Sequence, residues 1–167
     1  GLGLWRALWE AGQPHGIVAG GYRAIDSLRL EKGYCVWGAD ITPDETPYEG
    51  GVGFCVKLDK PGGFVGREAL VAAKERGPRM RLCCLTLEDP HSIALGNEPV
   101  RVGGEIAGRV TTSGYGYTVE CSIAYAYLPP EQGEPGTAVE VEIFGRWVAG
   151  EVAREPLFDP QGERVRA

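Results

Sequence analysis

Residues 79–88 read RMRLCCLTLE, and at this stretch the chain changes from helical to strand-like patterning. From here onward, short runs rich in Val, Ile, Leu and Tyr recur, and Gly, Pro or Asn residues separate them. Such runs at short spacing are typical of a small all-β barrel or sandwich. We predict strands within residues 79–88, 98–102, 105–110, 121–128, 138–144 and 147–153. Gly103-Gly104 and Gly145-Arg146 lie where two-residue hairpin turns belong.

The chain before residue 78 has a mixed pattern. Apolar residues at helical spacing predict helices at 2–11, within 20–34 (GGYRAIDSLRLEKGY) and at 66–77. Residues 53–59 (GFCVKLD) predict a strand, and residues 40–53 are loop-like because they hold two prolines and several glycines. Gly77-Pro78 then interrupts the pattern. We therefore predict an α+β fold with two domains, residues 1–77 and a small antiparallel β-barrel or sandwich over residues 78–167.

Composition excludes several classes of protein. A net charge of −6 and a pI of about 5.0 argue against non-specific nucleic-acid binding, which needs a concentrated basic surface. No apolar run reaches the roughly 20 residues of a transmembrane helix, and no signal peptide is recognisable. The five cysteines are scattered without a C-x-x-C motif, which predicts buried reduced thiols and no metal site. We expect a cytoplasmic protein without nucleic-acid or membrane partners.

The predicted helix within residues 20–34 is the strongest candidate for a functional site. It carries Asp26, Arg29 and Glu31, and Tyr34 and Trp37 follow it, just before the Pro/Gly-rich loop. One interpretation is an ordinary charged surface helix. The other is a wall of a pocket for a flat polar cofactor, since aromatic faces beside a few placed charges form such pockets. The tyrosine-rich run at 110–129 is likewise either barrel wall or a stacking surface.

The first half of the chain holds four motifs in order: Asp26-Ser27-Leu28-Arg29-Leu30-Glu31, Trp37-Gly38 with Asp40, Thr46-Pro47 with Glu49, and Phe64 with Gly66-Arg67-Glu68-Ala69-Leu70. Together they resemble the folate-binding aminomethyltransferase family. That family contains the glycine-cleavage T-protein and the carboxy-terminal parts of dimethylglycine and sarcosine dehydrogenases or oxidases. The resemblance implies the end of a folate-binding domain followed by the family's terminal antiparallel β-barrel. T-proteins typically have Arg where this chain has Ile25, so the chain is more similar to the dehydrogenase branch.

The resemblance implies a part in the transfer of a one-carbon unit to tetrahydrofolate. Tyr34 and Trp37 would wall the cofactor pocket, and Glu31 or Glu49 would accept hydrogen bonds from pterin N–H groups. Arg23 or Arg29 would meet carboxylates. The family's catalytic aspartate belongs to an amino-terminal half without a counterpart here, so we predict no catalytic residue in this chain and little activity from it alone.

The expected partner is that missing half or another chain that supplies it, with a flavin domain or a lipoyl carrier protein as further candidates. Two alternatives stay open. One is a non-catalytic module that binds folate or a partner. The other is a barrel that scaffolds a larger flavoenzyme.

Overall fold

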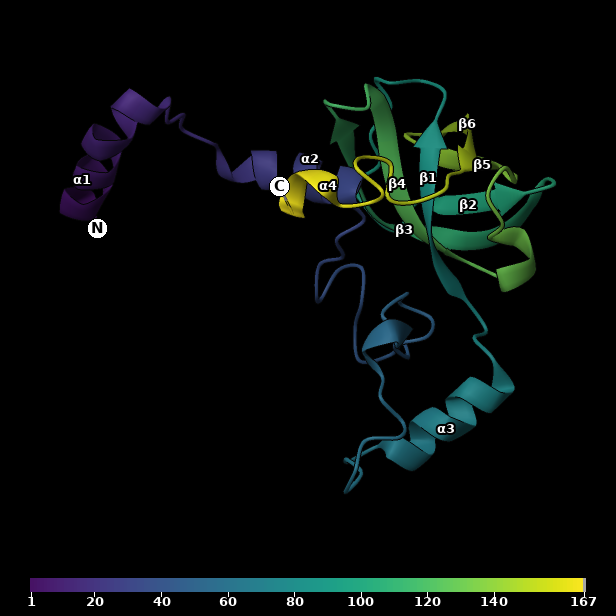
Figure 1. The fold of residues 1–167 in the computed structure, drawn as a ribbon. Coiled ribbons are helices and arrows are strands. Elements are labelled where there is room, and N and C mark those ends of the chain that lie inside the picture. Colours follow the sequence, from purple (N-terminus) through teal and green to yellow (C-terminus); the bar gives the residue numbers. More distant parts are fainter. Residues whose placement is uncertain (167) are drawn as a thin grey trace.

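The computed structural model describes residues 1–166, except the side chain of Val165, and its centre is a closed β-barrel (Figure 1). The neighbouring strands follow the order β1-β4-β3-β2-β5-β6, and every pairing is antiparallel. Closure comes from β1 and β6, where Leu85 lies opposite Val152. The strands are β1 (Arg81–Leu87), β2 (Pro99–Val102), β3 (Glu105–Gly116), β4 (Cys121–Leu128), β5 (Ala138–Ile143) and β6 (Arg146–Val152). The prediction of an α+β fold with an antiparallel barrel is confirmed.

Two apolar clusters explain the strand sequences. The barrel interior holds alternate residues of each strand, such as Leu85, Val110 and Val141. A second cluster lies on the outer face of β1 and β4, where Cys84, Ile123 and Tyr125 pack with Leu30 of a helix. Because β1 and β4 are covered on both faces, they are apolar almost throughout instead of alternating.

Both predicted hairpin turns contain glycine as expected, but the second turn lies one residue earlier than predicted. Gly103 and Gly104 have φ of 61° and 90°, as a turn between twisted strands requires. The β5–β6 turn is formed by Phe144 and Gly145, one residue earlier than predicted, and Phe144 has φ of 50°. The barrel register places Ile143 opposite Arg146, and this pairing fixes the turn although Phe disfavours positive φ.

Three longer helices lie outside the barrel: α1 (Leu2–Gly12), α2 (Tyr22–Lys32) and α3 (Arg67–Arg76). Only α2 packs on it, against β3, while α1 projects away from the rest of the chain (Figure 1). No residue of α1 is buried. Short helical turns complete the chain: η1 (Gln13–His15), η2 (Gly53–Cys55), η3 (Pro130–Gln132) and α4 (Glu163–Arg166).

The strand predicted at residues 53–59 is wrong. This segment holds η2 followed by turns. A strand needs a partner for its backbone N–H and C=O groups, and the closed barrel offers no free edge. The predicted domain division at residues 77/78 stays a prediction; α3 ends at Arg76 and β1 begins at Arg81.

Candidate functional site

Helix α2 is fixed on the barrel by its buried side. Leu30 is fully buried in the outer cluster, and the Ser27 hydroxyl donates to the carbonyl of Tyr115 at 2.7 Å. The helix ends at Gly33, whose φ of 76° is the left-handed conformation that glycine adopts without strain. Lys32, in the last turn, pairs with Asp159 near the C-terminus of the chain at 3.0 Å. The loop that follows α2 therefore starts from a fixed point.

Asp40 anchors this loop from a fully buried position. One carboxylate oxygen accepts from the Arg29 guanidinium at 3.0 Å and from the Val36 N–H at 2.8 Å. The other accepts from the Thr111 and Thr112 hydroxyls of β3, both at 2.6 Å. Four donors satisfy the buried charge, as a charged group without solvent requires. The network joins α2, the loop and the barrel.

Tyr127 of β4 adds a further anchor. Its hydroxyl donates to the backbone carbonyl of Asp40 at 2.9 Å. Burial, with smaller contributions from nearby carboxylates, raises the pKa of Tyr127 well above its ordinary value, so the phenol stays a donor at physiological pH. Neither Asp40 nor Tyr127 was among the predicted site residues. Asp40 did belong to the recognised Trp37-Gly38 motif, and that was the available signal.

The loop anchored in this way presents the two predicted aromatic residues to solvent. Tyr34 is 59% exposed and Trp37 is 72% exposed. Large aromatic side chains at such exposure are available for stacking or docking.

The predicted charged residues of α2 are already engaged within the fold. The Arg29 guanidinium is 11% exposed and bonds to both Asp26 and Asp40. Glu31 is 1% exposed, and its Oε1 accepts from the Thr118 N–H at 2.6 Å. Its Oε2 has no partner among the residues that the structure describes.

Glu49 belongs to the Pro/Gly-rich loop and lies beside the start of β1, apart from the other four predicted residues. Its carboxylate accepts from the N–H and hydroxyl of Thr46, both at 2.9 Å, and from the N–H of Arg79 at 3.2 Å. Burial opposes its ionisation, but these bonds and the charge of Arg79 together lower the pKa of Glu49. Its backbone carbonyl also accepts from the N–H of Leu82. Glu49 thus fastens the Pro/Gly-rich loop to the barrel.

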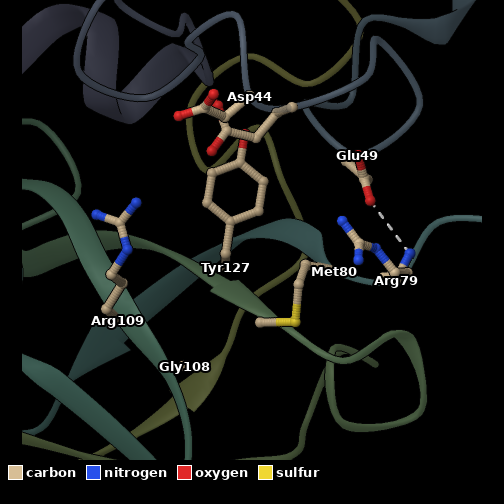
Figure 2. Close-up of a pocket in the computed structure, with 8 residues that line it drawn as sticks. Asp44, Glu49, Arg79, Met80, Gly108, Arg109 and Tyr127 are labelled. Carbon is tan, nitrogen blue, oxygen red and sulfur yellow. Dashed lines mark hydrogen bonds between the residues drawn. The ribbon is translucent and has the colours of Figure 1, made fainter.

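Glu49 also lines a pocket of about 550 Å³ between this loop and the barrel (Figure 2). Asp44 and Glu45 of the loop, Arg79, Met80 and Arg109 line the rest, with Tyr127 between them. This volume lies within the range of small-molecule sites. Tyr34, Trp37, Arg29 and Glu31 do not line it.

Among residues 1–166, no cluster of three or more His, Cys, Asp or Glu side chains suits a metal ion. No helix in this part of the chain combines the length and apolarity needed to cross a bilayer.

Comparison with known proteins gives matches both for the barrel and for the region that contains α2. The model of the glycine cleavage T-protein C-terminal barrel domain matches residues 80–159, and that of the GCVT N-terminal domain matches residues 1–60. The chain belongs to the glycine cleavage T-protein family. The predicted resemblance is therefore confirmed, and α2 with its loop falls in the region matched by the N-terminal domain.

Members of this family are similar to the chain over nearly all of its length. It is 42% identical to 4-methylaminobutanoate oxidase (formaldehyde-forming) of Paenarthrobacter nicotinovorans, over 96% of the chain and 19% of the relative. It is 41% identical to aminomethyltransferase of Symbiobacterium thermophilum, over 93% of the chain and 41% of the relative. The crystal structure of glycine cleavage system aminomethyltransferase T from Bartonella henselae superposes with a TM-score of 0.84, at 31% identity, over 95% of the chain and 45% of that structure.

The chain spans only part of these family members. It corresponds to about a fifth of the oxidase and two fifths of the aminomethyltransferase. The dimethylglycine and sarcosine dehydrogenases match over a similar share, 19% of each for the rat and mouse enzymes.

Proposed function

We propose that this chain forms part of a tetrahydrofolate-dependent aminomethyltransferase, and that α2 and its loop contribute one wall of the cofactor pocket. The observation that carries the proposal is the buried Asp40 network, which holds Tyr34 and Trp37 exposed within the region matched by the GCVT N-terminal domain. A rigid loop that keeps two large aromatic side chains in water gains nothing for its own stability. Such groups are explained by a ligand or a partner that covers them.

The residues present fit tetrahydrofolate in part. A flat pterin ring needs an aromatic face, and Tyr34 and Trp37 offer such faces. The pterin also needs acceptors for its N–H groups, and the unpartnered Oε2 of Glu31 is an acceptor, although it is buried. Arg29 and Glu49 are engaged in the fold, so we propose that they position the loop rather than bind the cofactor.

These contacts support separate roles for tetrahydrofolate and for the residues of this chain. Bound tetrahydrofolate would supply the amine that accepts the one-carbon unit. The chain's own residues would hold the ring plane through Trp37 and Tyr34, while Asp40 and Arg29 keep the loop from moving when it is occupied. Preorganisation of this kind lowers the cost of binding. Proton transfer at the reacting centre is assigned to no residue of this chain.

We propose that the partner is the part of the family's architecture that this chain does not match, in the same or another polypeptide. The exposed apolar residues of the N-terminal region support this: Trp5 is 54% exposed, Leu8 58% and Phe54 77%. Helix α1, whose Trp5 and Trp9 rings stack at 5.8 Å, has an amphipathic surface without an intramolecular partner among the described residues. A soluble monomer rarely leaves so much apolar surface uncovered.

Isothermal titration calorimetry tests the proposal. The chain alone should bind tetrahydrofolate weakly or not at all, and binding should appear when the unmatched amino-terminal part of the Symbiobacterium aminomethyltransferase is supplied. Trp37→Ala should then weaken binding, whereas Phe144→Ala, which removes an equally exposed aromatic side chain from the β5–β6 turn, should not. Tight binding by the chain alone would instead favour a self-contained folate-binding module. If the two variants bind tetrahydrofolate with equal affinity, Trp37 is not part of the pocket.

A further inference from the structure

The pocket between the loop and the barrel has a distribution of charge that the proposed folate site does not use. Two guanidinium groups, of Arg79 and Arg109, lie on opposite sides of the Tyr127 ring, and the Asp44 carboxylate lies at the loop side (Figure 2). The three charged residues come from separate segments: Asp44 from the loop, Arg79 from the entry to β1 and Arg109 from β3. The fold therefore brings together three charged residues that lie far apart in the sequence.

The carboxylates that line this pocket differ in the number of hydrogen bonds that they accept from the protein. Glu45 bonds to the N–H and hydroxyl of Thr42, and Glu49 bonds to Thr46 and to the Arg79 backbone. Both therefore serve the loop as internal caps. The Asp44 carboxylate has no hydrogen-bond or ion-pair partner among the described residues, and it lines the pocket from an exposed position.

The two arginines likewise have guanidinium N–H groups without a hydrogen-bond partner among the described residues. The Arg79 guanidinium makes no hydrogen bond or ion pair within residues 1–166. Arg109 uses one nitrogen, Nη1, to donate to the Asn97 side chain at 2.8 Å. Because a guanidinium has five N–H donors, most of the donor capacity of both groups remains available. Arginine forks are well matched to carboxylates.

We propose that this pocket binds a small amino acid in its zwitterionic form. The ligand carboxylate would lie against Arg79, its ammonium group against Asp44, and its carbon chain against Met80 and the Tyr127 ring. A simple anion fits less well, because the pocket has more carboxylates than guanidinium groups in its lining. A simple cation fits less well, because two guanidinium groups face the same space. A molecule with both charges satisfies the free groups of both signs.

The pocket adjoins the proposed tetrahydrofolate site through Tyr127, whose hydroxyl bonds to the Asp40 carbonyl and whose ring lines the pocket, but the two sites share no residue proposed to contact tetrahydrofolate. Trp37 and Tyr34 do not line this pocket, and Arg79, Arg109 and Asp44 have no part in the Asp40 network. The two proposals can therefore fail independently: loss of folate binding leaves this pocket intact, and the reverse also holds.

Titration of the ¹⁵N-labelled chain followed by two-dimensional NMR tests the inference. Glycine and 4-aminobutanoate are the zwitterionic probes and differ in the separation of their charges; acetate and methylammonium supply each charge alone. We expect at least one zwitterion to shift the amide signals of Met80, Gly108 and Arg109 and to bind more tightly than either half-molecule. Arg79→Gln should weaken that binding by about tenfold or more, since it removes a charge-assisted contact. Its backbone N–H still bonds to Glu49, so the fold is preserved.

The matched control is Arg154→Gln, which removes an exposed arginine that does not line this pocket. This variant should bind the probe as the parent chain does. Four results overturn the inference: acetate binding as tightly as both zwitterions, methylammonium doing so, an equal effect of the two arginine variants, or no shift at these amides with any probe at 50-fold excess over about 1 mM protein.

Discussion

Replacement of Asp40 by alanine is the most informative single change in this protein. The substitution removes an acceptor for four donors and leaves the Arg29 guanidinium, only 11% exposed, without its buried counter-charge. Removing one partner of a buried ion pair typically costs about 3–5 kcal/mol. Arg29 keeps its bond to Asp26, which limits the loss, but the Val36 N–H and the Thr112 hydroxyl lose their partner as well. We therefore expect the free energy of unfolding to fall by about 3–5 kcal/mol.

For a chain of this size, that loss corresponds to a decrease in melting temperature of about 6–20 °C. Urea denaturation followed by circular dichroism measures it, and hydrogen exchange at the Val36 amide shows whether the loop opens. The control is Asp26→Ala, which breaks the other ion pair of Arg29; Asp26 is 55% exposed, so this variant should lose less than about 1 kcal/mol. If the two variants differ by less than about 1 kcal/mol, Asp40 does not anchor the loop and the reasoning fails.

Three further predictions concern titratable groups and backbone strain. The exposed Cys55 should react with a thiol reagent at pH 8 much faster than Cys83 and Cys84, because burial raises the pKa of the last two to about 11 and about 12; equal rates, followed by mass spectrometry, would show that the barrel opens readily. Partial desolvation raises the pKa of Glu155, although the residue still reaches solvent, so its ionisation destabilises the fold only modestly as pH rises from about 4.5 upward. Glu155→Gln should therefore increase stability at pH 7 but not at pH 4, and a gain independent of pH in urea denaturation would contradict this. Phe144→Gly relieves a positive φ in an exposed turn and should raise stability by about 1 kcal/mol, as a shift in the urea midpoint; an unchanged midpoint would mean that the turn is unstrained.

The barrel could be predicted well because its strands carry strong local signals. Five of the six predicted runs contain the observed strands or most of them, the run at 105–110 covers the first half of β3, and the Gly103-Gly104 turn is where the sequence placed it. The β3 strand extends to Gly116, beyond the predicted run, because pairing with β4 overrides the low strand propensity of Gly114 and Gly116. The false strand at 53–59 had similar composition but no partner.

The site was predicted only in part because its polar contacts join residues far apart in the sequence. Glu31 and Arg29 looked like free charges on a helix, yet their partners are Thr118 and Asp40, set by how α2 lies on β3. The Asp40–Thr111 bond spans 71 residues, and no periodicity reveals such a pairing.

The closing of the barrel by its first and last strands also sets the order in which the chain can become ordered during synthesis. Strand β1 cannot complete its pairing until Val152 has emerged from the ribosome, and α2 docks on surfaces made by residues 111–118. The last contacts of α2, from Phe158 to the Glu31 carbonyl and from Asp159 to Lys32, come later still. Residues 22–40, although made before the barrel strands, therefore gain their fixed geometry only when the barrel and residues 158–159 are available.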